Sequence, residues 1–254
     1  MTNPDWDQHW QEYTPSAEIG PANGFRRRIM LRLLDMPHDN ASVRMLEIGS
    51  GTGEFAAEFT RRYPKASFLG LELSRVGVEV SARRVPSAQF LQRNLLVPIP
   101  PEELPETRSN FAVCSEVLEH LDEPAILLRN AAACMAPGCK IVVTVPGGPM
   151  SAFDRYIGHR KHYRPEELKA TLQRAGFTVE AAYGAGFPFF NLYRATIILR
   201  GGQLRNDISG SPSLLVRAGM MVFDFLFRLN FSMRGGWQTI AVARYRGPSS
   251  PGAA

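Results

Sequence analysis

The sequence has few cysteines and no cysteine pattern that indicates a metal site or a disulfide framework. Only Cys114, Cys134 and Cys139 occur in 254 residues, and their spacing matches no zinc motif. An odd number of cysteines, two of them in segments that we expect to be buried, is typical of reduced thiols in a cytosolic protein. The first residues, MTNPDWDQHWQEY, lack the apolar run of a signal peptide. We therefore expect a cytoplasmic protein that binds no metal.

The sequence also lacks long runs of charge of one sign. The net charge is +5, but the basic residues are scattered, with only short clusters at Arg26–Arg28 and Arg160–Lys161. Because no basic helix or aromatic-interleaved basic stripe occurs, we expect no nucleic-acid partner. With 44% hydrophobic and 21% charged residues, the chain has the composition of one large folded domain rather than of a disordered protein.

From Val43 onward, short apolar runs alternate with helical patterns. This alternation predicts an α/β fold, Rossmann-like and doubly wound, with a mostly parallel sheet. In such sheets, ligands bind beyond the carboxyl ends of the strands. The expected strands are 43–48, 67–72, 89–92, 111–115, 140–145, 177–183 and 238–245, and the expected helices are 52–62, 74–84, 123–135 and 164–175.

We expect the whole chain, 1–254, to form a single domain with additions. Residues 1–40 form an N-terminal helical lid, 41–185 and 235–246 the core, 186–234 an apolar helical insert, and 247–254 a disordered tail. In the insert, Leu214–Phe231 reads as a helix with one narrow charged stripe. Its three charges argue against a membrane span. The insert is therefore a substrate lid, a homodimer interface or a membrane-surface contact.

The stretch MLEIGSGTGEF, residues 45–55, is a glycine-rich turn after a predicted strand. A dinucleotide fingerprint, G-x-G-x-x-G, needs a third glycine where this chain has Glu54. Glu47 and Glu54 would repel a diphosphate at the helix N-terminus. A nucleoside that carries a cationic group instead of phosphates would suit the same turn. Glu72 ends the next strand, where an acidic residue accepts hydrogen bonds from ribose hydroxyls.

Four segments together resemble the class I S-adenosylmethionine-dependent methyltransferases. They are VRMLEIGSGTGEF, FLGLELS, FLQRNL and FAVCSEVLEHL, which occur in the family's order and spacing between Val43 and about Gly186. The last predicted strand then corresponds to the family's antiparallel strand. EVLEHL and PGCKIVVTVPG resemble the branch that methylates small molecules, including quinone precursors and natural products. The chain lacks the [D/N]-P-P-[Y/F/W] motif of the enzymes that methylate amino groups in nucleic acids.

The resemblance implies S-adenosyl-L-methionine as the cofactor and assigns residues to it. Around the methionine portion it places Glu47, Gly49, Ser50, Gly51 and Gly53. It implies that Glu72 binds the ribose and that Leu73 and Asn94 contact the adenine. Ser115 and Glu116 would lie beneath the methyl donor. Asn94 stands where the family often has Asp, and its side-chain oxygen can still accept from the adenine amine.

Histidines are the candidate bases, because an imidazole can take a proton from a hydroxyl near neutral pH. His120 follows the fourth expected core strand, and its alternative role is helix packing. The stretch DRYIGHRKHYRPEEL adds His159 and His162, with Tyr156 and Tyr163 as substrate contacts. Trp6, Trp10 and Tyr13 share one helix face, which either docks the helix on the domain or closes as a lid over cofactor and substrate. In the lid, Tyr13 is expected nearest the methyl donor and in contact with the substrate.

The sequence therefore predicts a methyltransferase that acts on a partly hydrophobic small molecule, with O-methylation favoured over N- or C-methylation. One alternative is a nicotinamide-dependent oxidoreductase, which the position of Glu54 disfavours. Another is a cofactor-binding protein without methyl transfer or with peripheral membrane association. A third is a protein that uses the same cofactor in a different step.

Overall fold

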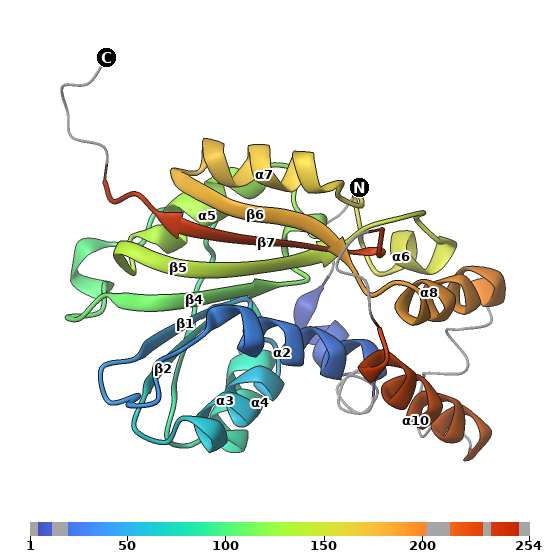
Figure 1. Ribbon diagram of the computed structural model, residues 1–254. Coiled ribbons are helices and arrows are strands. Elements are labelled where there is room, and N and C mark those ends of the chain that lie inside the picture. The colour runs from blue at the N-terminus through green and yellow to red at the C-terminus, as the bar shows by residue number, and fades with distance from the viewer. Residues whose placement is uncertain (1–4, 12–19, 202–213, 231–234, 249–254) are drawn as a thin grey trace.

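A computed structural model of the chain describes residues 5–11, 20–201, 214–230 and 235–248. These residues fold around a seven-stranded sheet of order β3-β2-β1-β4-β5-β7-β6 (Figure 1). The strands are β1 (Arg44–Ile48), β2 (Ser67–Glu72), β3 (Gln89–Gln92), β4 (Ser109–Ser115), β5 (Met135–Pro146), β6 (Phe177–Ala185) and β7 (Gln238–Tyr245).

The pairing of the strands confirms the predicted fold class. β1 to β5 pair in parallel, and β7 runs antiparallel between β5 and β6. The parallel strands bring the ends of β1, β2 and β4 to one edge, where Ile48 pairs with Leu71 and Cys114. Residues that follow these strands therefore gather at this edge, as expected for a Rossmann-like sheet.

Helices cover both faces of the sheet. Figure 1 shows α5 and α7 above it and α2 and α3 beneath it. Side chains that alternate along β1 enter different cores: Leu46 and Ile48 pack with α5 and α7, whereas Met45 packs with α2 and α3. These helices and their neighbour are α2 (Pro21–Leu34), α3 (Glu54–Arg62), α4 (Arg75–Arg84), α5 (Pro124–Ala132) and α7 (Pro165–Arg174).

Several predicted boundaries are wrong, and the largest error is at the junction between α5 and β5. The helix expected over 123–135 ends at Ala132, and Met135 already belongs to β5. Met135 is buried and pairs with Ser109 of β4, ahead of a register shift. This irregular start accommodates Pro137 and Gly138 within the strand, because a bulge relaxes the need for a continuous hydrogen-bond ladder. Tertiary pairing, which local sequence does not reveal, thus decides the boundary.

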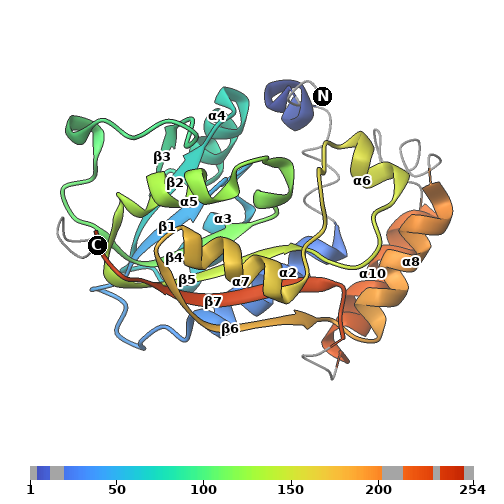
Figure 2. The ribbon, with the colours of Figure 1, turned by 90° about the horizontal axis from the view of Figure 1, so that it is seen from above.

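The apolar insert packs at the end of the molecule that lies away from β3 and α4 (Figure 2). It contains α8 (Phe189–Arg200) and α10 (Leu214–Arg228). Phe190 and Phe227 pack with Phe25 of α2 in a small aromatic core of their own. Asp224 of α10 also accepts a hydrogen bond from Arg28 at 2.9 Å. The insert is therefore anchored to α2 rather than to the sheet.

The other side of α10 is exposed and apolar. Met221, Val222 and Phe225 are 57–67% exposed, and their spacing places them along one face of the helix. Within the described residues, no helix has the length and apolarity needed to cross a membrane. Such a face is compatible with the predicted interface and with the predicted membrane-surface contact, and both stay predictions.

Candidate active site

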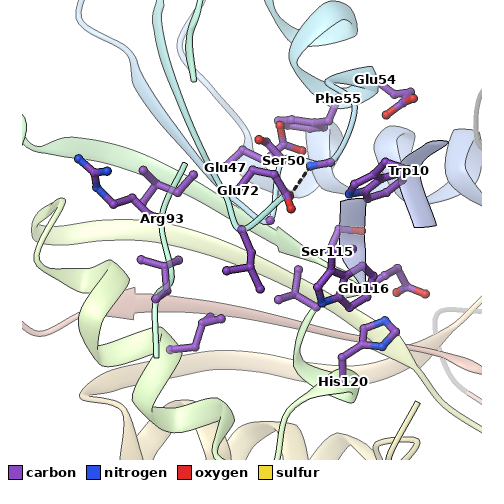
Figure 3. Close-up of a pocket in the computed structure, with 18 of the residues that line it drawn as sticks. Trp10, Glu47, Ser50, Glu54, Phe55, Glu72, Arg93, Ser115, Glu116 and His120 are labelled. Carbon is purple, nitrogen blue, oxygen red and sulfur yellow. Dashed lines mark hydrogen bonds between the residues drawn. The ribbon is translucent and has the colours of Figure 1, made fainter. Parts of the chain in front are cut away.

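A cavity of about 300 Å³ opens at the carboxyl ends of β1, β2 and β4. Its size is at the lower end of the range for small-molecule sites. Figure 3 shows Arg93 at one end of it, and Trp10, Glu116 and His120 at the other. The predicted cofactor residues that line the cavity are Glu47, Gly49, Ser50, Gly51, Glu72, Leu73, Asn94, Ser115 and Glu116.

The glycine turn after β1 has the backbone conformation and the close contacts that require glycine. Gly49 and Gly51 have φ angles of +71° and +53°, in the left-handed region. A Cβ on Gly49 would lie 2.4 Å from Cγ2 of Val117, and one on Gly51 would lie 2.9 Å from the Trp10 ring. The two glycines therefore let the turn pack closely against Val117 and Trp10 at the wall of the cavity.

Replacing Gly49 with alanine is expected to lower the free energy of unfolding by about 1–3 kcal/mol, the usual range for a non-glycine residue forced into the left-handed region. The collision with Val117 is also expected to distort the cavity, so binding of S-adenosylmethionine should weaken. Urea denaturation and calorimetric titration measure the two effects.

The matched control is Gly219→Ala in α10, where a Cβ meets nothing within 4 Å. This substitution is expected to stabilise the chain by about 0.5–1 kcal/mol. Wild-type stability and binding in Gly49→Ala would contradict this account of the turn.

Glu72 fastens the glycine turn to the end of β2. Its two carboxylate oxygens accept hydrogen bonds from the backbone N–H of Gly51 at 2.8 Å and of Ser74 at 2.9 Å. Burial raises the pKa of Glu72, while these hydrogen bonds act in the opposite direction. A carboxylate oxygen accepts more than one hydrogen bond, so capacity remains for ribose hydroxyls. The ribose-binding role of Glu72 stays a prediction.

Glu47 is a buried carboxylate with one oxygen that has no hydrogen-bond partner within the described part of the chain. Its Oε2 atom makes no hydrogen bond, and neither does Oγ of Ser50 beside it. Burial, followed by the nearby charges of Glu54 and Glu72, raises the pKa of Glu47 well above its usual value. A cationic amino group placed here would satisfy Glu47 and offset the local negative charge. The residues present therefore fit the methionine portion of S-adenosylmethionine.

Gly53 has a different role from the other two glycines of the turn. It does not line the cavity; it forms the N-cap of α3 with φ +83°. A Cβ there would lie 2.8 Å from Cβ of Ser81 in α4. Glu54, the next residue, lines the cavity but is neutralised by Arg84 at 2.8 Å. Gly53 thus allows α3 and α4 to pack closely, and its predicted contact with the cofactor stays a prediction.

A short N-terminal helix, residues 6–11, covers one side of the cavity. Its Asp7 accepts hydrogen bonds from Ser74 and from the backbone of Val76 at the start of α4. Its Trp6 packs edge-on against His120 with 4.8 Å between ring centroids. Trp6 and Trp10 both line the cavity. The helix therefore contacts both the start of α4 and His120. Tyr13 lies outside the described residues.

Sequence reasoning missed the charged group that α2 contributes. Arg26 lines the cavity and pairs with Glu116 at 3.2 Å. Glu116 has a φ of +56°, rare for a residue with a side chain, and also accepts from Gln238 of β7 at 2.9 Å. The cluster Arg26–Arg28 was the available signal, but nothing local showed that α2 would cross the end of β4. Ser115 in turn shares a hydrogen bond with Thr144 at 2.8 Å.

Of the three predicted catalytic histidines, only His120 lines the cavity, and it is carried by the 3-10 helix η2 (Leu118–His120). His159 packs behind it, with 4.7 Å between ring centroids. His162 lies further back, where its Nε2 is 3.4 Å from Nδ1 of His159. Burial lowers the pKa of His120 to about 4 and that of His159 to about 3. Both imidazoles are therefore neutral at physiological pH.

The two tyrosines predicted as substrate contacts lie away from the cavity lining. Tyr163 is buried, and its hydroxyl donates a hydrogen bond to the carbonyl of Leu118 at 3.1 Å. Tyr156, in the short helix α6 (Ala152–Tyr156), is 50% exposed. Tyr163 thus holds η2 in place, and a contact of either tyrosine with substrate stays a prediction.

Comparisons with known proteins agree with this geometry. A family model described as a methyltransferase domain matches residues 22–182. A trans-aconitate 2-methyltransferase of Methylobacterium nodulans is 32% identical over 144 residues, which cover 56% of this chain and 50% of that protein. A ubiquinone biosynthesis O-methyltransferase of Pseudomonas fluorescens is 24% identical over 196 residues, covering 70% and 80%. The chain thus spans only half the length of the first of these relatives.

Solved structures share the fold. A phosphoethanolamine N-methyltransferase of Haemonchus contortus in complex with S-adenosyl-L-methionine superimposes with a TM-score of 0.57 at 16% identity, covering 87% of this chain and 52% of the other. The family match decides against the oxidoreductase alternative. The family model covers more than half of the chain, and the chain therefore belongs to the methyltransferase-domain family.

Proposed function

We propose that the chain transfers the methyl group of S-adenosylmethionine to a hydroxyl oxygen of a small, uncharged and partly hydrophobic molecule. The acceptor end of the cavity carries the aromatic rings of Trp6 and Trp10 and the aliphatic side chains of Val117 and Leu121. These side chains favour an apolar acceptor body and exclude water from the reacting atoms.

The observation that carries this proposal is the pairing of the cavity's arginines. Each arginine in the lining has a carboxylate partner: Arg26 with Glu116 at 3.2 Å, Arg27 with Glu58 at 2.9 Å and Arg93 with Glu103 at 2.6 Å. An acidic acceptor would have to break such a pair and leave a partly buried carboxylate without its cation, which is costly. Glu47 and Glu72 add negative charge that disfavours an anionic acceptor further.

The cofactor supplies a methyl group that its sulfonium already activates. The chain's own task is to align the acceptor and to hold water away, since methyl transfer is an in-line displacement. Glu72 and the glycine turn fix the nucleoside end, while Glu47 fixes the cationic end. The short N-terminal helix covers the acceptor end through Trp6 and Trp10.

Proton removal from the acceptor is placed at the His120 side of the cavity. His120 is the predicted catalytic histidine that lines it, and His159 supports it from behind. A neutral imidazole with so low a pKa accepts a hydrogen bond but is a weak base on its own. The structure behind His120 therefore bears directly on how the acceptor is activated.

A panel of acceptors tests the proposal. The purified chain is incubated with S-adenosylmethionine and, in parallel, an alkyl-substituted catechol, trans-aconitate and phosphoethanolamine. Formation of S-adenosylhomocysteine and the mass of the methylated product are measured. Turnover of the catechol alone is expected. Turnover of the acid or the amine without the catechol would contradict an uncharged hydroxyl acceptor.

A further inference from the structure

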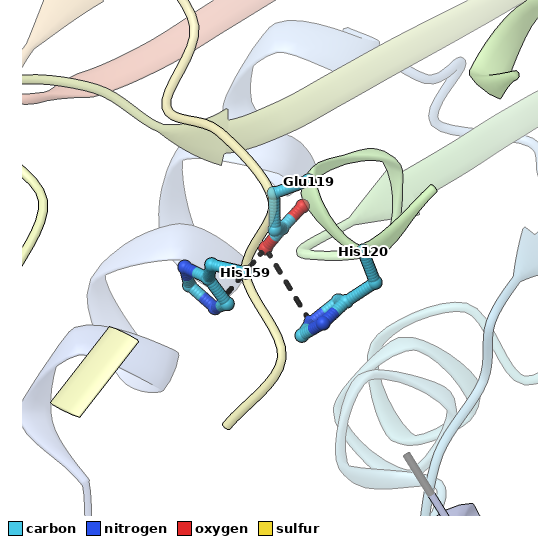
Figure 4. Close-up of side chains that lie close together, drawn as sticks. All are labelled: Glu119, His120 and His159. Atoms are coloured by element: carbon cyan, nitrogen blue, oxygen red, sulfur yellow. Dashed lines mark ion pairs between the residues drawn. The ribbon is translucent and has the colours of Figure 1, made fainter. Parts of the chain in front are cut away.

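A group of metal-ligand side chains lies directly behind the cavity wall. Glu119 and His120 are neighbours in η2, and His159 comes from the segment between α6 and α7 (Figure 4). Oε1 of Glu119 lies 4.0 Å from Nε2 of His120 and 3.9 Å from Nε2 of His159. The three ligand atoms all lie within 4.8 Å of one another.

Glu119 is the unusual member of this group. Its side chain is 0% exposed, and within the described residues neither carboxylate oxygen has a hydrogen-bond partner. A buried carboxylate without a partner is strongly disfavoured, and unsatisfied buried groups in a folded protein call for an explanation such as a bound ion. One of these oxygens, Oε1, faces both histidines (Figure 4). A cation between the three side chains would satisfy them.

We propose that Glu119, His120 and His159 bind a divalent transition-metal ion of the zinc type. Two imidazole nitrogens with one carboxylate oxygen form a ligand set that such ions use, with one or more positions left open. Ligands bound at about 2.0–2.2 Å lie roughly 3–3.5 Å apart. The present separations of 3.9 and 4.0 Å therefore need only a small side-chain rotation to close on an ion.

The surroundings of His159 suit a metal ligand. Its Nδ1 faces Oδ1 of Asp154 at 3.9 Å and Nε2 of His162 at 3.4 Å. Metal-bound histidines commonly have a carboxylate near the second ring nitrogen, which orients the ring. Asp154 is already held by Arg194 at 2.8 Å and by the backbone N–H of Ser151 at 2.7 Å. Asp154 and His162 thus orient the ring of His159, and Glu119 is the carboxylate that binds the ion.

The site's position gives it a role, which rests on the proposed function. His120 lines the cavity, so an open coordination position faces the acceptor. An acceptor hydroxyl bound there is more acidic and loses its proton to water. Its oxygen lone pair forms the new O–C bond, while the electrons of the S–C bond go to sulfur and neutral S-adenosylhomocysteine leaves. The weak basicity of the histidines is then no obstacle to proton removal.

The test is calorimetric titration of the chelator-treated full chain with zinc sulfate. One equivalent is expected to bind with micromolar affinity or better. Glu119→Gln and His159→Gln are each expected to weaken binding by more than about 100-fold, because even outer-shell partners are worth about 10–100-fold. The control, Glu123→Gln, removes an exposed carboxylate close to the site in the chain and should bind zinc as the wild type does. Absence of zinc binding, or unchanged affinity in both test variants, would overturn the site.

Further measurements distinguish metal binding from a role of the metal in methyl transfer, and both from a failure of the variant to fold. The absorption spectrum of bound Co²⁺ should show the bands of a low-coordinate site in wild type and lose them in Glu119→Gln. Circular dichroism identifies any variant that fails to fold, in which case the other variant decides. Zinc binding without methyl transfer to any acceptor would support the site and contradict the proposed function. Equal methyl transfer by metal-free and zinc-loaded protein would overturn the role in activation.

Discussion

Replacing Phe227 with alanine is expected to lower the free energy of unfolding by about 3–5 kcal/mol, the usual cost of removing a buried phenylalanine ring. Phe227 is 3% exposed. Its ring centroid lies 5.4 Å from that of Phe25 in α2 and 5.5 Å from that of Phe190 in α8. It therefore joins the insert to the rest of the molecule, and its loss leaves a cavity where three helices meet. Urea denaturation followed by circular dichroism measures the change.

The neighbouring Phe225 provides the matched control. It lies on the same helix but is 62% exposed. Phe225→Ala is therefore expected to change the free energy of unfolding by no more than about 0.5 kcal/mol. If Phe227→Ala were as mild as Phe225→Ala, the insert would not unfold together with the sheet, and its anchoring to α2 through the aromatic core would be wrong.

Replacing Glu72 with alanine is expected to weaken the binding of S-adenosylmethionine by about 1–3 kcal/mol, or roughly 5- to 150-fold in the dissociation constant. The substitution removes the acceptor for the ribose hydroxyls. It also removes the hydrogen bonds that hold the amides of Gly51 and Ser74, so the glycine turn loses its attachment to β2. Calorimetric titration measures the affinity.

Glu79→Ala is the control for Glu72. Glu79 is a glutamate in the middle of α4, where it pairs with Arg75 on an exposed surface and does not line the cavity. Its replacement is expected to leave the affinity for S-adenosylmethionine unchanged, because exposed ion pairs of this kind contribute little. Equal affinities in Glu72→Ala and wild type would contradict the ribose-binding assignment.

The sheet could be predicted closely because its strands are short apolar runs between clear breaks. The expected bounds of β2, β3 and β7 are those observed, and Ser74 caps α4 through the backbone N–H of Gly77 as expected. The end of α5 could not be predicted, since Met135 is drawn into β5 by its pairing with Ser109. Local periodicity describes a helix face but not a strand partner that is distant in the chain.

The cofactor half of the site was more predictable than the acceptor half. Glu47, Glu72 and the glycine turn follow consecutive strands, so parallel topology alone brings them together. Arg26 comes from α2, and its pairing with Glu116 depends on how that helix crosses the sheet. The group of Glu119, His120 and His159 joins two separate segments without the regular spacing of a metal motif. For that reason the sequence predicted no metal, whereas the arrangement in space leads to the proposal of one.

The most direct test of the account is calorimetric titration of the purified chain with S-adenosylmethionine, S-adenosylhomocysteine and NAD in parallel. Glu47 and Glu72 line a cavity that suits a cationic nucleoside and opposes a diphosphate. Binding of the first two ligands at micromolar concentration, with none of NAD, is the predicted result. Binding of NAD alone would contradict the cofactor assignment and, with it, methyl transfer.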